Sequence, residues 1–101
     1  MRKPEPIIYV GRLEDGAPAV YAVGGTAERL LPAGARIDWG AGDIDAATEL
    51  ARALILHAAG QDPSTEVARR FAEQVLSRMP RDGFALQCDT VNAWLRRVVT
   101  V

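Results

Sequence analysis

The sequence is poor in the side chains on which most enzyme chemistry depends, with one cysteine, one histidine and two serines among 101 residues. The single cysteine, Cys88, cannot form an intramolecular disulfide, which excludes a secreted fold held together by disulfides. The longest apolar stretch, residues 50–59, is interrupted by Arg52 and His57 and falls short of the roughly 20 apolar residues of a membrane span. Residues 7–10 are too short for the apolar core of a signal peptide. We therefore expect a cytoplasmic protein that does not enter the membrane.

The sequence also lacks an excess of charge of either sign. Its net charge is −1, with 25% charged and 49% hydrophobic residues, the proportions of an ordinary globular protein. These values exclude a disordered tail, a collagen-like repeat and a strongly basic arm for nucleic acid. Lysine is nearly absent, with Lys3 beside eleven arginines, which we attribute to the codon bias of a GC-rich genome. The length predicts a single domain over residues 1–101.

β-Branched and aromatic residues predict an antiparallel hairpin near the N-terminus. Its strands are expected at residues 7–10 and 19–23, joined by a turn that contains glycine. A shorter segment, residues 29–31, ends before a proline and is interpreted as an edge strand. Pro18 comes just before the second strand, where it would cost no ladder hydrogen bond.

Residues 33–42 are interpreted as a connection with a brief extended piece. Ile37 and Trp39 would point the same way in an extended chain, so we expect both to fill the gap between sheet and helices. The pattern leaves open whether Tyr9 and Tyr21 face each other across the hairpin or one of them lies on an exposed face.

Apolar residues at helical spacing predict two helices in the second half of the chain. The first is expected over residues 45–59, with Asp43 or Asp45 as its N-cap and Gly60 just beyond its end. The second is expected over residues 62–79, with a proline in its first turn. Because the connection between them is short, we predict an antiparallel helical hairpin.

A short strand over residues 84–88 and a last helix capped by Asp89 or Thr90 complete the prediction. The expected fold class is α+β. An N-terminal antiparallel hairpin or three-stranded sheet packs on the helical hairpin, followed by the short strand and the C-terminal helix.

Four carboxylates lie close together in the sequence: Asp38, Asp43, Asp45 and Glu49. Oxygen ligands suit a hard cation, but the spacing matches no calcium-binding loop. Acidic residues in a first helical turn also complement the helix dipole, so we favour a capping role and expect neither a metal nor a cofactor. The glycines before this helix suggest a phosphate loop, but no lysine follows and the acids would repel a phosphate. His57 is interpreted as a cap residue and Cys88 as a buried structural residue.

Two arginine pairs, Arg69–Arg70 and Arg96–Arg97, are candidate nucleic-acid contacts. Residues 43–62 carry a net charge of −3, whereas residues 63–79 and residues 80–101 each carry +1. This distribution gives at most a modest basic patch, and we favour solvated helix faces.

A Trp-Gly-x-Gly turn leads into a Leu/Ala-rich helix, followed by a helix with a central phenylalanine, a Met-Pro stop and an aromatic-x-Leu strand. The residues concerned are Trp39, Gly40, Gly42, Leu50, Leu54, Phe71, Met79, Pro80, Phe84 and Leu86. On these residues the chain resembles a family of small bacterial proteins classed only as a domain of unknown function, often found on phages and other mobile elements. Ala41 stands where that family usually has an aromatic residue. The resemblance covers most of the chain and implies no activity.

Our leading hypothesis is a non-enzymatic protein-binding module, because no constellation of residues supports catalysis. The resemblance suggests a more specific version, an inhibitor of a bacterial defence complex such as an anti-CRISPR protein. The alternatives are a weak nucleic-acid-binding protein that uses the paired arginines, and a small enzyme with Asp43, Asp45 or His57 at the turn after Trp39.

The candidate binding residues are Trp39, Asp43, Asp45, Arg69, Arg70, Arg96 and Arg97. We expect a protein partner, and a homodimer stays open because an exposed Trp39 or Trp94 would mark an interface. For both tryptophans we favour a place in the core.

Overall fold

The N-terminal hairpin is present in the computed structural model, which describes residues 6–32 and 34–99. Strands β1 (Ile8–Glu14) and β2 (Ala17–Gly24) pair antiparallel and are longer than predicted. The two residues between them, Asp15 and Gly16, have φ angles of 53° and 80°. Positive φ at both central positions is what a type I′ turn requires, and this turn matches the twist of the paired strands.

Pro18 lies inside β2, opposite Leu13, and not before the strand as predicted. In a hairpin with a two-residue loop, the second pair from the turn makes no hydrogen bonds to its partner strand. The nitrogen of Pro18 therefore points away from β1. The next strand pairs only as far along β2 as Tyr21, so the missing N–H of the proline costs no ladder bond.

Two further strands complete a four-stranded antiparallel sheet in the order β3-β2-β1-β4. The predicted edge strand exists, but β3 spans Thr26–Arg29, earlier than the predicted residues 29–31. The reason is Gly25, whose φ of 84° turns the chain back immediately after β2. Strand β4 (Gly83–Gln87) is the predicted short strand, and it pairs with the free side of β1.

Helix α1 (Ile44–Ala59) agrees closely with its prediction, because both of its ends are set by local caps. Asp43 is the N-cap, and its carboxylate accepts hydrogen bonds from the N–H groups of Asp45 and Ala46. Gly60 ends the helix with a φ of 76°, the left-handed conformation that favours glycine.

Helix α2 (Thr65–Gln74) is shorter than predicted at both ends. It begins after Ser64, whose hydroxyl accepts a hydrogen bond from the N–H of Val67. It gives way to a 3₁₀ turn, η1 (Leu76–Arg78), where the carbonyl of Leu76 accepts hydrogen bonds from the N–H groups of Gly40 and Met79. The contact with Gly40 comes from a distant loop, so no local pattern in the helix could reveal this end.

Helix α3 (Cys88–Val99) follows β4 directly, ahead of the predicted caps at Asp89 or Thr90. The N–H of Cys88 donates to the carbonyl of Ile7 over 2.9 Å, so the strand pairing passes straight into the helix. Of the helices in the described part of the chain, none is long and apolar enough to cross a membrane.

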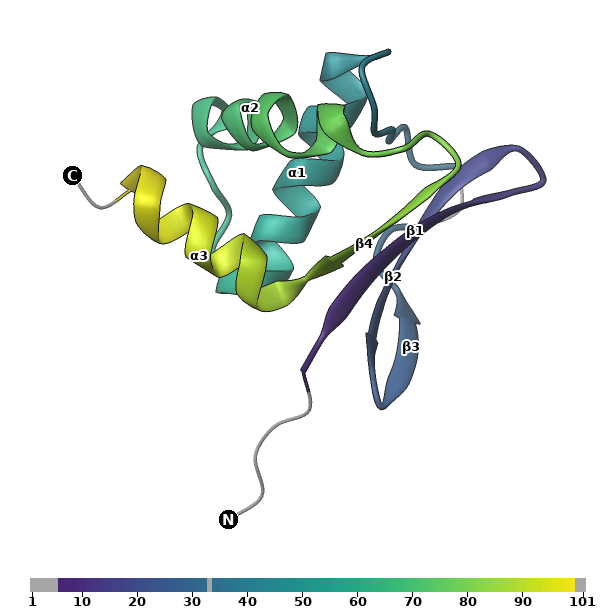
Figure 1. Ribbon diagram of the computed structural model, residues 1–101, viewed down its shortest axis with the longest axis horizontal. Coiled ribbons are helices and arrows are strands. Elements are labelled where there is room, and N and C mark those ends of the chain that lie inside the picture. Colours follow the sequence, from purple (N-terminus) through teal and green to yellow (C-terminus); the bar gives the residue numbers. More distant parts are fainter. Residues whose placement is uncertain (1–5, 33, 100–101) are drawn as a thin grey trace.

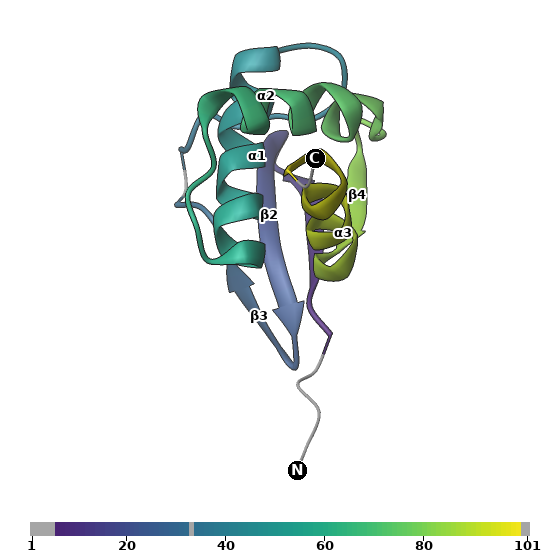
Figure 2. The same cartoon turned by 90° about the vertical axis from the view of Figure 1, so that its left-hand side faces the viewer.

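All three helices lie on one face of the sheet, which confirms the α+β fold class (Figures 1 and 2). Figure 2 shows α2 lying across the N-terminal half of α1, with α3 beside α1 and the sheet behind them. The core between the layers includes Tyr9, Leu50, Leu54 and Phe71. Among residues 6–32 and 34–99, no helix or strand covers the face of the sheet turned away from the helices (Figures 1 and 2), and this face carries the candidate site.

Ile37 and Trp39 fill the gap between sheet and helices, as predicted. The Trp39 side chain is 1% exposed and packs edge-to-face on Phe84, with ring centroids 4.9 Å apart. Its indole Nε1 donates to the carbonyl of Pro80 over 2.8 Å. Trp94 is also buried, so the preferred core position is confirmed for both tryptophans.

Candidate functional site

The acidic residues singled out in the sequence lie at the start of α1. Asp43 caps the helix and pairs with Arg36 at 3.5 Å. Its pKa lies below the usual value, first because of the hydrogen bond from the Ala46 N–H and then because of Arg36. Asp45 is exposed in the first turn. Within residues 6–32 and 34–99, no three histidine, cysteine or acidic side chains are grouped in a way that could hold a metal ion.

The groups proposed for an enzyme do not converge at the turn after Trp39. His57 lies in the last turn of α1, about 21 Å along the helix axis from Asp43, at 1.5 Å per residue. A hollow of about 170 Å³ does lie near the turn, but neither Asp43 nor Asp45 lines it. The geometry gives no support to acid–base catalysis there.

The two arginine pairs lie on separate helices and diverge. Arg69 and Arg97 each sit two residues from a neighbour in the groove between α2 and α3, Val67 and Leu95. Two residues along a helix correspond to about 200°, so these two arginines point away from that groove. Arg96, by contrast, is one of the groove's lining residues, so Arg96 and Arg97 point in different directions.

His57 is exposed at the end of α1, and Cys88 is half-buried at the start of α3, and both lie near the buried Tyr9. The Tyr9 hydroxyl and His57 Nδ1 are hydrogen-bonded at 2.8 Å, and the two rings meet edge-to-face. Burial, and secondarily the neighbouring Cys88 thiol, raise the pKa of Tyr9 well above its usual value. Cys88 is half-buried and receives a contact from the Asn92 amide at 3.7 Å. These contacts favour a structural role for His57 and Cys88.

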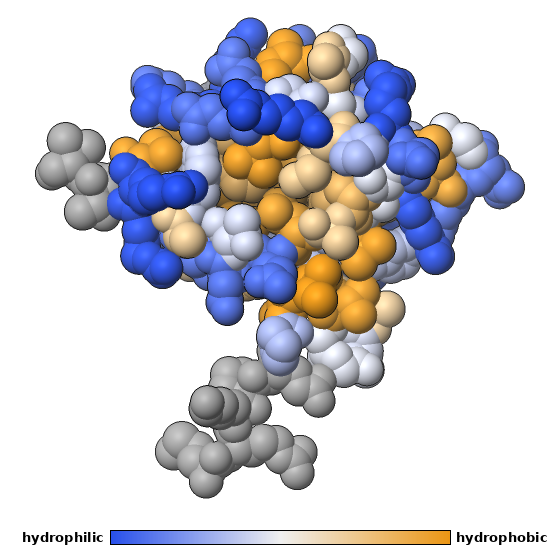
Figure 3. Space-filling model, viewed as in Figure 1, coloured by the Kyte–Doolittle hydropathy of each residue, from blue (hydrophilic) through white to orange (hydrophobic). Residues whose placement is uncertain are grey.

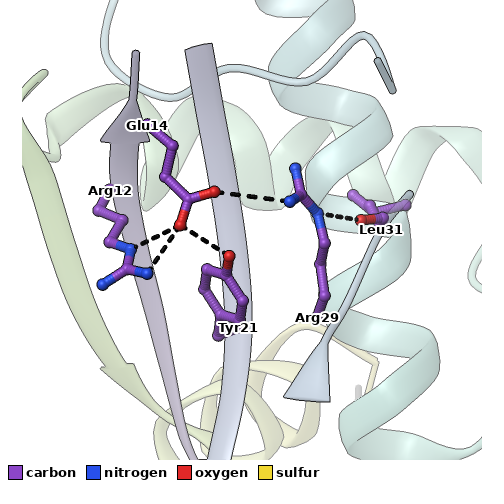
Figure 4. Close-up of polar contacts among 5 residues, drawn as sticks. All are labelled: Arg12, Glu14, Tyr21, Arg29 and Leu31. Carbon is purple, nitrogen blue, oxygen red and sulfur yellow. Dashed lines mark hydrogen bonds and ion pairs between the residues drawn. The ribbon is translucent and has the colours of Figure 1, made fainter. Parts of the chain in front are cut away.

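The strongest polar network lies on the uncovered face of the sheet (Figure 4). It consists of Arg12, Glu14, Tyr21 and Arg29, which we call the open-face cluster. Arg12 and Glu14 are two residues apart on β1, so their side chains share one face. Tyr21 pairs with Val10 on one side and with Arg29 on the other, which brings the cluster together from three strands.

The carboxylate of Glu14 is the centre of the open-face cluster. Its Oε2 accepts hydrogen bonds from Arg12 Nε at 3.0 Å, from Arg12 Nη2 at 2.7 Å and from the Tyr21 hydroxyl at 2.7 Å. Its Oε1 lies 3.5 Å from Arg29 Nη1, and Arg29 Nε donates to the carbonyl of Leu31. The hydrogen bond from Tyr21, followed by those from Arg12, holds the pKa of Glu14 below its usual range.

Both guanidinium groups are also held against the Tyr21 ring. Their central carbons lie 5.0 Å (Arg12) and 5.9 Å (Arg29) from the ring centroid, within the range of cation–π attraction. Each guanidinium has five N–H donors, and the contacts above use two of each. The cluster therefore presents a net charge of +1, with further donors on two arginines whose positions are already fixed.

A shallow apolar hollow of about 150 Å³ adjoins the cluster. Its lining residues are Val10, Arg12, Tyr21, Val23 and Ala27. Val23 is 36% exposed, one of the few large apolar side chains in the described chain with so much exposure. Seen along the β4 edge in Figure 3, apolar residues lie along β1 and β4, whereas hydrophilic side chains cover the outer sides of the helices.

Sequence reasoning missed the open-face cluster. The register of the hairpin resolves the position of its tyrosines: Tyr9 points into the core, and Tyr21 points to the uncovered face. The alternation of Arg12 and Glu14 with apolar residues was visible in the sequence. This alternation indicates a cluster only because β1 continues to Glu14 and β3 spans Thr26–Arg29.

Comparison with known proteins gives one result. The model of a family of unknown function, DUF6166, matches residues 8–97, and no curated protein or solved structure matches the chain. The matched residues run from the start of β1 to the last turn of α3, so they include the whole sheet with its open-face cluster. The expectation of a domain-of-unknown-function family is confirmed. Because the match covers most of the 101 residues, the chain belongs to DUF6166.

Proposed function

We propose that this protein is a non-enzymatic protein-binding module that docks its partner on the uncovered face of the sheet. The observation that carries the proposal is the open-face cluster beside the apolar hollow: two arginines paired with Glu14 and an aromatic ring next to Val10, Val23 and Ala27. Arginine and tyrosine are the residue types enriched at the energetic centres of protein interfaces. Groups already held in place lose little conformational entropy on binding.

The partner that fits this surface presents an acidic side chain next to an apolar one. The excess positive charge and the unused guanidinium donors suit a carboxylate, which arginine can bind through two parallel hydrogen bonds. The neighbouring hollow, at about 150 Å³, suits one branched aliphatic side chain. An acidic and an apolar residue two apart on an extended segment would project on the same side and reach both.

The more specific version stays a prediction. The resemblance to small proteins of bacterial mobile elements motivates a partner within a bacterial defence complex, and an anti-CRISPR role is one form of that idea. The open-face cluster supports protein binding in general and carries no information about which complex is bound.

The test compares two double variants in pull-downs from bacterial lysate. Arg12→Gln/Arg29→Gln removes two exposed charges from the open-face cluster. Arg69→Gln/Arg97→Gln removes two exposed charges from the helical side and serves as the matched control. We expect the wild type and the control to retain a stoichiometric protein that the first variant loses. The same partner retained by all three proteins, or no stoichiometric partner at all, would contradict the proposal.

A further inference from the structure

A groove larger than either hollow described above lies on the helical side, away from the open-face cluster. It has a volume of about 480 Å³ and lies between the end of α1, the start of α2 and one side of α3. Figure 2 shows the three helices that contribute its lining residues, with α2 and α3 both beside α1. Its lining residues are Ile55, Ala59, Gln61, Asp62, Pro63, Ser64, Val67, Asn92, Leu95 and Arg96.

The groove exists because α2 and α3 meet at one end only. At that end Phe71 and Trp94 pack edge-to-face with centroids 5.0 Å apart, and the Trp94 indole donates to Gln74 over 3.0 Å. Toward the start of α2, the smaller Val67 and Leu95 stand at the facing positions and are only half-buried. Together with Ile55, which is only 2% exposed, they line the apolar floor of the groove.

Among the residues that the structure describes, the rim of the groove carries a guanidinium, that of Arg96, with no ion-pair partner. Asp62, also at the rim, is paired with Arg52 at 3.4 Å. Arg96 has no carboxylate within 4.0 Å among residues 6–32 and 34–99. The groove thus combines an apolar floor with a guanidinium at its edge.

We propose that this groove binds a small amphipathic carboxylic acid, with the apolar body on Ile55, Val67 and Leu95 and the carboxylate on Arg96. Small-molecule sites in proteins have volumes of about 300–1,000 Å³ and combine mainly apolar walls with a few polar groups that orient the ligand, as this groove does. The site is separate from the proposed docking surface, so either proposal can fail without the other.

The test uses octanoate as the probe, with binding followed by NMR on the ¹⁵N-labelled full chain. We expect saturable shifts of the amide signals of Ser64, Val67 and Leu95. Arg96→Gln should weaken binding about tenfold, the order expected for losing one charge-assisted hydrogen bond. Arg97→Gln, one residue away but outside the groove lining, should bind as the wild type does.

Two further measurements keep the proposal falsifiable. Ala59→Leu extends an exposed side chain into the groove at the last residue of α1, and it should abolish the shifts while the protein remains folded. Equal affinity for octanol and octanoate, or equal effects of the Arg96 and Arg97 variants, would overturn the proposal. Groove signals that respond to an amphipathic helical peptide but not to octanoate would assign the groove to a protein segment instead.

Discussion

At the scale of single residues, Gly11 decides how closely Phe84 can approach the sheet. A Cβ atom at position 11 would lie 2.1 Å from Cε2 of Phe84, far inside van der Waals contact. The ring lies across β1 because glycine has no side chain, and Trp39 then packs on the same ring. The positions of Phe84 and Trp39, both distant in the sequence, thus depend on the missing methyl group of Gly11.

Gly11→Ala should therefore destabilise the protein by about 1–3 kcal/mol, the usual cost of overpacking a filled core. The free energy of unfolding from urea denaturation measures the effect. In a Phe84→Leu background the same substitution should cost less, because the smaller side chain leaves room for the methyl group. Equal costs in the two backgrounds would mean that the clash with Phe84 is not the cause.

Among the groups that lower the pKa of Glu14, Tyr21 has the largest effect, through the hydrogen bond from its hydroxyl. A carboxyl whose pKa is depressed by folding contributes stability that is fully present above its ordinary value of 4.5 and lost as the pH falls through the folded value. Tyr21→Phe removes only the hydroxyl, so the pKa of Glu14 should rise toward 4.5. Carboxyl ¹³C NMR titration would show the rise, and an unchanged midpoint would refute this role of Tyr21.

At the scale of elements, the N-terminus of α1 has two acidic residues, Asp43 and Asp45, that are equally plausible N-caps in the sequence. Only Asp43 accepts hydrogen bonds from the first turn, whereas Asp45 acts at most through the helix dipole. Asp43→Ala should lower the free energy of unfolding by about 1 kcal/mol, as other N-cap losses do. Asp45→Ala should cost clearly less in the same thermal or urea measurement, and the reverse order would exclude Asp43 as the cap.

The elements fixed by local chemistry could be predicted, and those fixed by distant contacts could not. Helix α1 and the hairpin have their caps, turn and periodicity within the segment itself. The end of α2 depends on Gly40, and the start of α3 depends on Ile7, each far away in the sequence. The open-face cluster could not be predicted for the same reason. It joins three strands, so its prediction needs the register of β3 as well as that of the hairpin.

At the scale of the whole molecule, the arrangement is two layers, with helices on one side and solvent on the other (Figure 1). Its shortest dimension is 20 Å, against 42 Å for the longest. Figure 1 looks down this shortest axis and shows helices and sheet side by side, so the proposed docking surface and the proposed groove are not separated across the 20 Å dimension. Because they share no lining residue, a partner on the sheet would leave the groove accessible.

Because only one face of the sheet is covered, its inward and outward residues are under different constraints. Along β1, residues such as Tyr9 and Gly11 face the core and are constrained by packing, whereas their neighbours Val10 and Arg12 face outward. If this face is the docking surface we propose, substitutions at the outward positions would change what it recognises at little cost to folding. A lineage of such proteins could then alter its binding specificity strand by strand while the buried half of each strand stays the same.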